Sequence, residues 1–448
     1  MKETFDCILK SGEVVLRHNG TWMKTQTDIG LRAGKIAHLG ELKVQKGQKI
    51  YDCQGLTILP GLIDSQVHFR EPGLEYKEDL ESGSRGAVLG GVTAIFDMPN
   101  TKPSITNLTH WQNKMALAQN RMWCNYAFYV GATLNNIEEL PQLEQQEGCC
   151  GVKIFMGSST GDLLVDQLTG LKKILSLIKR NVAVHSENEK LLKEKSSLRV
   201  NNMPYSHTIW RDEEVAFSST QDLLRLANET GKKIHVLHVT TAQEMELLSK
   251  NKHIASVEVT PQHLTFSAPE IYDRLGTYAQ MNPPIRSEFH QKALWQALHQ
   301  GVVDVLGSDH APHTREEKNK PYPLSPSGMP GVQTIVPVML NHVYQQRLSL
   351  FRLVELMAEK PAELFKIKNK GKIAIGYDAD FTIVDLNKKW TIEDTWMATK
   401  CGWTPFAGMN VTGFPTMTII HGNAVQIEGQ LAPSQQGRCL EFTDLTYL

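Results

Sequence analysis

Short apolar runs alternate with longer amphipathic stretches through the middle of the chain, from about residue 56 to residue 370. The apolar runs have the length of buried strands, and the stretches between them carry apolar residues at helical spacing. This order of elements predicts repeated βα units around a parallel sheet. The runs that we expect to be strands are residues 56–64, 90–98, 125–131, 151–157, 181–187, 233–240, 254–260 and 302–310.

Eight predicted strands are the number that closes a (β/α)8 barrel, so we expect an α/β fold of the TIM-barrel type. A doubly wound open sheet is the structural alternative. No G-x-G-x-x-G motif follows the first predicted strand, and its absence argues against an open sheet that binds a dinucleotide.

The two ends of the chain differ from the middle, because both contain short β-rich segments broken by glycine. We expect both termini to form one small β-sandwich domain, so that residues 1–55 and 371–448 build the sandwich and residues 56–370 build the barrel. A chain of 448 residues exceeds the size at which one core usually stops growing, which favours two domains. Two separate small caps on the barrel are the alternative.

Composition and charge set aside several kinds of partner. The 47 basic residues nearly cancel the 48 acidic ones, so a net charge of -1 gives no general reason to bind nucleic acid or an anionic membrane. The chain has no apolar run of about 18 residues, and we expect no membrane-spanning helix. Seven cysteines without zinc-finger spacing predict no disulfide framework, and the N-terminal segment lacks the apolar centre of a signal peptide. We therefore expect a cytoplasmic protein.

Histidine and acidic residues gather where the predicted strands end. Barrel enzymes carry their chemistry at the C-terminal ends of the strands, so these side chains should meet at one mouth. Imidazole and carboxylate suit Zn²⁺, which prefers a few nitrogen and oxygen ligands and an open position for water. The residues concerned are His68 and Arg70 after the first strand, His185 on the fifth, His238 on the sixth and Asp309 on the eighth.

Lys153 lies in an apolar setting on the fourth predicted strand. An unpaired ammonium would be costly there, and desolvation would lower its pKa and make the neutral amine available. A neutral amine can react with CO₂ to form a carbamate, whose two oxygens can bridge two cations. An ordinary lysine paired with a carboxylate is the alternative, and position alone leaves both open.

Several ordered segments resemble the dihydroorotases of the amidohydrolase superfamily. The likeness spans about residues 60–330 and extends through GYDADFTIVDL on the C-terminal side. It implies a zinc-dependent enzyme that reversibly cyclises N-carbamoyl-L-aspartate to (S)-dihydroorotate in pyrimidine biosynthesis. The segments are PGLIDSQVHFREPG (60–73), FDMPNT (96–101), GVKIFMGSS (151–159), VHSE (184–187), HVLHVTT (235–241), MNPPIR (281–286) and GSDHAPH (307–313).

The resemblance also implies residue roles and partners. One or two zinc ions would be bridged by a carboxylated Lys153, and Asp309 would also transfer protons. The implied metal ligands are His68, Lys153, His185, His238 and Asp309. The implied substrate-binding residues are Arg70, Asn100 and His313 for a carboxylate and Asn282 for the pyrimidine ring. As partners we expect a small-molecule substrate, a second copy of the chain in a homodimer, and an association with aspartate carbamoyltransferase.

The metal motif on the first strand departs from the family pattern. The usual His-x-His is here Gln66-Val67-His68. Glutamine offers a neutral amide oxygen, which is a poorer zinc ligand than imidazole, so the first metal should bind more weakly. A site that holds only one zinc ion is therefore an alternative to the two-ion site. The other interpretation is that Gln66 is a hydrogen-bonding group behind the ligands.

Arg70 carries the predicted choice of substrate, because a guanidinium pairs bidentately with a ring carboxylate. A salt bridge from Arg70 to Glu71 or Glu75 is the alternative for this side chain. For the whole chain, the alternatives are another cyclic amidohydrolase of the dihydropyrimidinase or allantoinase type and a non-catalytic scaffold for aspartate carbamoyltransferase. Gln66 favours the scaffold, whereas retention of the other metal-site residues opposes it.

Overall fold

The computed structural model describes residues 4–44, 48–157 and 162–444, so the last two residues of the GVKIFMGSS segment lie outside the described residues. Eight parallel strands form one sheet in which each strand pairs with the next along the chain. A parallel bridge between Val67 and His310 joins the first strand to the segment after the last, and the sheet nearly closes into a barrel. The strands are β6 (Leu62–Val67), β7 (Val92–Asp97), β8 (Asn125–Gly131), β9 (Cys149–Phe155), β10 (Val182–His185), β11 (Ile234–Val236), β12 (Ala255–Val259) and β13 (Val305–Leu306).

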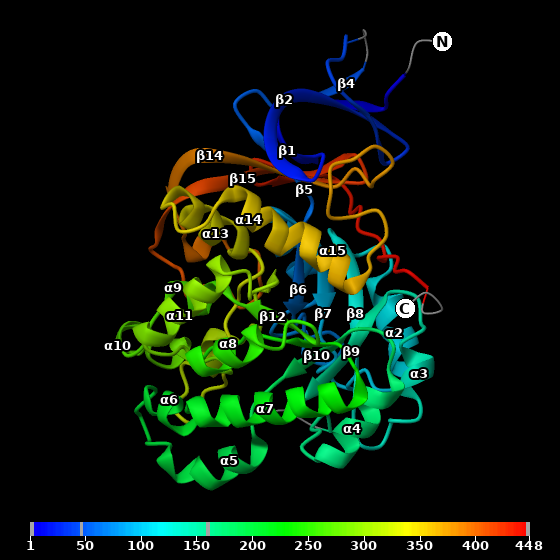
Figure 1. Ribbon diagram of the computed structural model, residues 1–448. Coiled ribbons are helices and arrows are strands. Elements are labelled where there is room, and N and C mark those ends of the chain that lie inside the picture. Colours follow the sequence, from blue (N-terminus) through cyan, green and yellow to red (C-terminus); the bar gives the residue numbers. More distant parts are fainter. Residues whose placement is uncertain (1–3, 45–47, 158–161, 445–448) are drawn as a thin grey trace.

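Helices surround this barrel, as Figure 1 shows. The longest, α7 (Glu213–Thr230), begins where Asp212 accepts a hydrogen bond from the amide of Val215 (3.2 Å) and ends at Gly231, whose φ is +69°. The other α-helices are α1 (Leu80–Leu89), α2 (Leu108–Ala118), α3 (Leu140–Leu143), α4 (Leu168–Leu177), α5 (Glu189–Glu194), α6 (Ser206–Trp210), α8 (Ala242–Ser249), α9 (Pro261–Thr265), α10 (Glu270–Leu275), α11 (Glu288–His299), α12 (Arg315–Lys318), α13 (Ile335–Tyr344), α14 (Leu350–Val354) and α15 (Lys360–Phe365). Short 3₁₀-helices are η1 (Lys195–Leu198), η2 (Gly276–Ala279) and η4 (Asp394–Trp396), and η3 (Glu355–Glu359) is a π-helical segment between α14 and α15.

None of the helices in the described ranges is long and apolar enough to span a membrane. The barrel strands are buried on both faces, as expected of a parallel sheet that helices cover. Inside the barrel, Phe96 packs edge-on against Phe365 at the end of α15, with ring centroids 4.8 Å apart. Tyr129 also lies beside Phe365, so the interior is a packed core and the chemistry must lie at one mouth.

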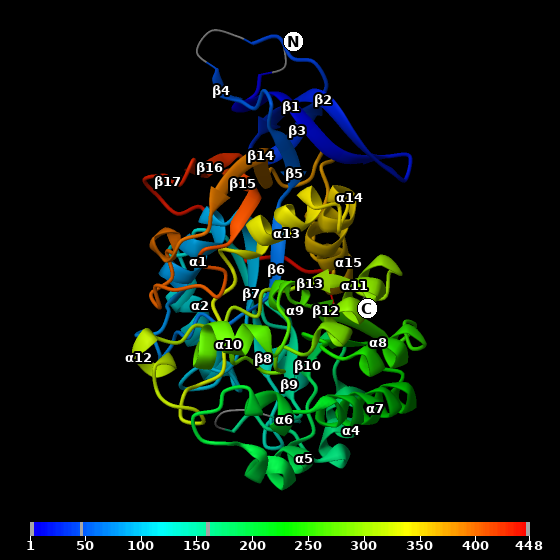
Figure 2. The same cartoon turned by 90° about the vertical axis from the view of Figure 1, so that its left-hand side faces the viewer.

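Both termini contribute to a second sheet, seen above the barrel in Figures 1 and 2. Its order is β17-β16-β15-β14-β5-β1-β2-β3, and β4 also pairs with β1. Apolar residues of both termini share one cluster, including Leu9, Ile29, Phe381 and Ile419. The strands are β1 (Cys7–His18), β2 (Thr21–Arg32), β3 (Lys35–Leu39), β4 (Lys49–Asp52), β5 (Thr57–Pro60), β14 (Phe381–Thr391), β15 (Asn410–Ile420), β16 (Asn423–Ile427) and β17 (Gln430–Leu431).

The predicted (β/α)8 barrel and the small β domain shared by both termini are therefore confirmed. The domain expected as a β-sandwich is one nine-stranded sheet, and the open sheet and the two separate caps are wrong. The exact domain boundaries remain a prediction. One predicted strand needs correction, because residues 56–64 contain two strands in different sheets: β5 joins the terminal sheet and β6 begins the barrel. The break falls at Gly61, where a Cβ would lie 2.4 Å from Oγ1 of Thr93. A continuous apolar run does not show such a change of sheet.

Candidate active site

The barrel strands begin beside the terminal sheet, because β5 passes directly into β6 through Gly61. Their C-terminal ends therefore open on the side away from that sheet (Figure 1). At this mouth the predicted metal ligands are almost fully buried, with exposures of 8% or less. They are His68 just after β6, Lys153 within β9, His185 at the end of β10, His238 after β11 and Asp309 after β13.

Three residues at the mouth adopt a left-handed backbone conformation that non-glycine residues seldom use. The φ angles are +64° at Arg70, +36° at His238 and +45° at Asp309. Such backbone strain persists only where the surrounding structure enforces it, and it concentrates at functional sites. The loops after β6, β11 and β13 thus hold these side chains in fixed directions.

One group of side chains surrounds the carboxylate of Asp309. Nε2 of Gln66 donates a hydrogen bond to Oδ1 of Asp309 (3.1 Å), and Nε2 of His68 lies 3.2 Å from the same oxygen. The other ring nitrogen of His68, Nδ1, lies 2.6 Å from Oδ1 of Asn100. Asp309 is therefore held by two nitrogen groups from the end of β6.

A second group contains the two histidines of β10 and the β11 loop. Nδ1 of His185 lies 3.0 Å from Nε2 of His238, and Nε2 of His185 lies 2.8 Å from Glu187. Arg211 forms an ion pair with the same carboxylate. Burial alone would raise the pKa of Glu187, but the charge of Arg211 and the hydrogen bond with His185 lower it to about 2. Glu187 is therefore an anion that accepts the Nε2 proton of His185 and leaves Nδ1 as the lone pair facing His238.

Lys153 lies between these two groups. Its Nζ has no hydrogen-bond partner among the described residues, and burial lowers the pKa of the amine to about 7. The charge of Asp309 partly opposes that shift, whereas the charge of Lys153 contributes, after burial, to the lowered pKa values of His185 and His238. The register pairs Lys153 with Ala183 of β10, so this unpaired amine, which loses its proton more readily than an exposed lysine, lies at the same mouth.

Within the described ranges, no three His, Cys, Asp or Glu side chains converge as a ready-made metal cluster. Each of the two groups supplies two such side chains, His185 with His238 and His68 with Asp309, and each is one donor short. The unpaired Nζ of Lys153, on β9 next to β10, is a further donor at the same mouth. A divalent cation fits this arrangement once Lys153 contributes a ligand, because nitrogen and oxygen donors from a few residues are what zinc takes.

Arg70 lies beside His313, the other basic residue predicted for the carboxylate. Its NH2 lies 3.4 Å from Nε2 of His313, and its Nε donates to the carbonyl of Pro312 (3.3 Å). The expected alternative partners are engaged elsewhere: Glu71 pairs with Arg121 (2.8 Å) and Glu75 accepts from the amide of Gly73 (2.7 Å). No carboxylate forms an ion pair with Arg70 in the described part of the chain.

Asn100 and Asn282 contact different histidines of this region. Asn100 is next to His68, whereas Oδ1 of Asn282 lies 3.0 Å from Nε2 of His207. The hydroxyl of Ser327 lies 3.4 Å from the same nitrogen of His207, and the carbonyl of Ser327 lies 3.0 Å from Nε2 of His313. Contacts through Ser327 therefore link Asn282 to the Arg70–His313 pair.

The residues that sequence reasoning missed all act behind the predicted ones. Glu187 had a signal, because it stands two positions after His185 in the VHSE segment. Arg211 and His207 had none, since they reach the mouth from α6 and its C-terminal end, far along the chain from β10. Only folding brings them together.

Comparison with known proteins agrees with this geometry. The model of the amidohydrolase family matches residues 57–425. The chain is 34% identical to the dihydroorotase of Methanosarcina mazei over 431 residues, covering 92% of this chain and 94% of that relative. It is 32% identical to the allantoinase of Desulfitobacterium hafniense over 451 residues, covering 97% and 98%.

A solved structure is similar over nearly the whole fold. The L-hydantoinase (dihydropyrimidinase) of Arthrobacter aurescens superposes with a TM-score of 0.91 at 30% identity, covering 97% of this chain and 99% of that one. The family model matches most of the chain, and relatives above 30% identity cover nine-tenths of it. The chain belongs to the amidohydrolase family and is a cyclic amide hydrolase.

Proposed function

We propose that the chain is a dihydroorotase, which reversibly cyclises N-carbamoyl-L-aspartate to (S)-dihydroorotate in pyrimidine biosynthesis. The observation that carries the proposal is Arg70, a guanidinium only 8% exposed at the mouth of the barrel, with no carboxylate partner among the described residues. A buried cation of this kind is costly unless an anion pairs with it. Dihydroorotate brings a ring carboxylate, which a guanidinium can bind with two parallel hydrogen bonds.

The other substrate residues support the same orientation. His313 lies beside Arg70, and Asn282 reaches the region through Ser327 and His207, so we assign the ring carboxylate to Arg70 and His313 and the ring edge to Asn282. Asn100, also predicted for the carboxylate, contacts His68 at 2.6 Å. It can therefore orient that imidazole as well as meet the substrate.

Members of the family are generally metal-dependent, and we propose zinc with Lys153 as a carbamate. The residues available to hold one or two ions are His68, Lys153, His185, His238 and Asp309. When bound, such an ion lowers the pKa of a water toward ~7 and polarises the carbonyl that is attacked. The lowered pKa of Lys153, about 7 because of burial, supplies the neutral amine that carbamate formation requires. Burial of the whole group excludes bulk water and strengthens its electrostatic interactions.

Asp309 is the proposed proton carrier. In the hydrolytic direction its carboxylate takes the proton of the attacking water and passes it to the ring nitrogen as the amide bond breaks. The hydrogen bond from Gln66 (3.1 Å) and the contact with Nε2 of His68 (3.2 Å) hold one carboxylate oxygen and leave the other for this transfer. In the biosynthetic direction the same residue removes the proton from the attacking ureido nitrogen.

A panel of substrates tests the proposal. Purified protein is assayed with dihydroorotate, N-carbamoyl-L-aspartate, allantoin, hydantoin and dihydrouracil, with and without chelator. We expect kcat/KM for dihydroorotate to exceed that for the uncharged rings by about 100-fold or more, because those rings leave Arg70 unpaired. Faster turnover of hydantoin or allantoin would contradict the proposal and favour another cyclic amidohydrolase.

Another cyclic amidohydrolase remains the second candidate, because the allantoinase and the L-hydantoinase resemble the chain nearly as closely as the dihydroorotases do. The non-catalytic scaffold is set aside, since the chain is a cyclic amide hydrolase. A homodimer, an association with aspartate carbamoyltransferase and a cytoplasmic location remain predictions.

A further inference from the structure

The carboxamide of Gln66 faces Asp309 with its nitrogen. Gln66 is 1% exposed, its Nε2 lies 3.1 Å from Oδ1 of Asp309, and its Oε1 has no hydrogen-bond partner in the described part of the chain. The reverse orientation would place two acceptor oxygens against each other, one of them charged, and is unfavourable. An amide nitrogen has no lone pair for a cation, so the atom that Gln66 turns toward Asp309 is a hydrogen-bond donor, and its neutral Oε1 is the one atom of the carboxamide that a cation could use.

His68 acts on the same oxygen. Its Nε2 lies 3.2 Å from Oδ1 of Asp309, and its Nδ1 lies 2.6 Å from Oδ1 of Asn100. A neutral imidazole donates from only one of these nitrogens, so Gln66 is the assigned hydrogen-bond donor to Oδ1 of Asp309, and Nε2 of His68 lies beside the same oxygen. A cation at this place would have to displace both contacts and would gain only a neutral amide oxygen where the family has an imidazole.

The group of His185 and His238 has the opposite character. Glu187 takes the Nε2 proton of His185, so Nδ1 presents a lone pair 3.0 Å from Nε2 of His238. The amine of Lys153 has no hydrogen-bond partner among the described residues. Its Nζ lies 4.5 Å from the ring centroid of Phe155, which is itself 6.0 Å from that of His185. His185, His238 and Lys153 can therefore supply three nitrogen donors to one ion on this side of the mouth.

We propose that the chain holds a single divalent ion, on His185, His238 and Lys153, and that Gln66 stands in for a second ion by donating a hydrogen bond to Asp309. Gln66 is then a positioning residue: it keeps the proton-carrying carboxylate oriented without a cation. The inference rests on the proposed function, since it specifies the metal count of that same site.

The metal count of the full chain tests the inference directly. Purified protein is incubated with excess zinc in bicarbonate buffer, freed of unbound ion, and analysed by elemental mass spectrometry and native mass spectrometry. We expect one ion per chain for the wild type and two for Gln66→His, because the added imidazole completes the pair formed by His68 and Asp309. Two ions in the wild type would overturn the inference without any variant.

Two further variants separate a donor from a ligand. Gln66→Asn keeps an amide that is one methylene too short for Asp309, and Gln66→Ala removes the amide; both should keep one ion while kcat falls about tenfold. Loss of the ion in either variant would show that Gln66 is a ligand and would overturn the inference. A wild-type chain that is fully active without any bound ion would instead reject the metal-dependent function on which the inference rests.

Discussion

The imidazole of His185 is held from both sides: its Nε2 lies 2.8 Å from Glu187, and its Nδ1 lies 3.0 Å from Nε2 of His238. Arg211 fixes the carboxylate of Glu187 in turn. A carboxylate in this position selects the histidine tautomer and raises the basicity of the nitrogen that faces the metal site. The geometry therefore extends the site beyond the residues that would touch an ion.

Replacing Glu187 should weaken metal binding. In Glu187→Gln the side chain keeps its volume but loses the charge that orders His185 and neutralises Arg211, and we expect the Kd for zinc to rise about 10- to 100-fold. Competition with a chromogenic chelator measures this Kd. Glu194→Gln, at a side chain that is 54% exposed, is the matched control and should leave it unchanged. An unaltered Kd in Glu187→Gln would contradict the role assigned to this carboxylate.

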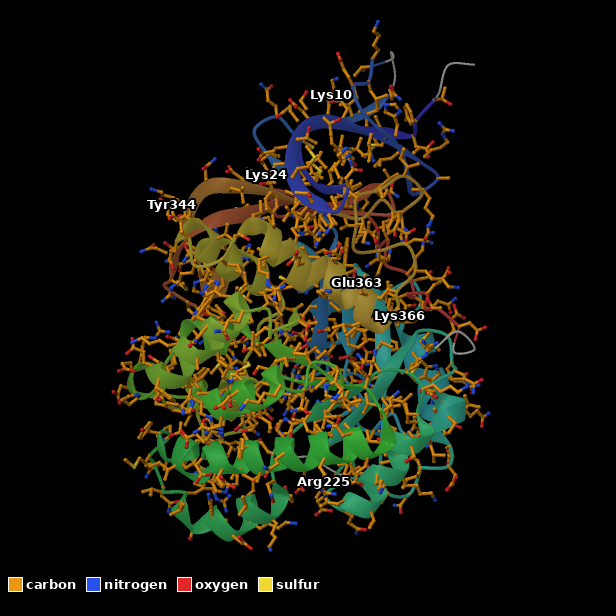
Figure 3. All side chains as sticks on the ribbon, viewed as in Figure 1. Lys10, Lys24, Arg225, Tyr344, Glu363 and Lys366 are labelled. Atoms are coloured by element: carbon orange, nitrogen blue, oxygen red, sulfur yellow. The ribbon has the colours of Figure 1, made fainter. Side chains whose placement is uncertain are left out.

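Removing the guanidinium of Arg70 should impair recognition of a carboxylated substrate. For Arg70→Ala we expect KM for dihydroorotate to rise about 10- to 100-fold, because the charge-assisted hydrogen bonds to the carboxylate are lost. The zinc content should stay near normal. Steady-state kinetics and metal analysis check both. Arg225→Ala is the control, because Arg225 lies on the outer surface of α7 (Figure 3) and is 49% exposed. If KM does not change, Arg70 does not bind the carboxylate.

Lys153 should be needed both for metal and for activity. Lys153→Ala removes the donor between the two groups of ligands, and we expect activity to fall below detection and the metal content to drop. Assay and elemental analysis of the same preparation measure the two effects together. Lys172→Ala, at a side chain that is 51% exposed, should behave as the wild type. An active Lys153→Ala protein that keeps its metal would rule out the carbamate.

Stability should depend on pH through Lys318, a lysine with no exposed surface that donates to the carbonyl of Pro326 (2.9 Å). Burial lowers its pKa from 10.5 to about 7 in the folded chain. Between these two values the unfolded chain binds a proton at this group that the folded chain lacks, so stability rises with pH across this window, by up to about 1.4 kcal/mol per pH unit.

The variant Lys318→Met should therefore flatten the rise in the free energy of unfolding between about pH 7 and pH 10. Denaturant titrations at several pH values in this range give the slopes for both proteins. Lys320→Met, at an exposed lysine two positions further on, should keep the wild-type slope. Equal slopes for the wild type and Lys318→Met would show that Lys318 stays charged in the folded chain.

Much of the fold follows from local patterns. The buried runs of β8 and β9 were recognisable because parallel strands covered by helices are apolar on both faces. The run at 56–64 was misread because an apolar segment carries no record of which sheet it joins, and the change at Gly61 depends on contact with Thr93. The last barrel strand, β13, is only two residues long although 302–310 was expected, since the rest of that run forms the loop that carries Asp309.

The order and spacing of the residues determined by themselves that a barrel forms and that His68, His185, His238 and Asp309 end its strands, because strand periodicity and the position of a side chain after a strand are local properties. Tertiary structure decided what these side chains touch. Gln66 meets Asp309 across 243 positions of the chain, and Arg211 meets Glu187 from the end of another helix. Such contacts depend on how segments far apart in the sequence pack together. The hydrogen-bond partners, the burial and the pKa values of the site residues follow from that packing.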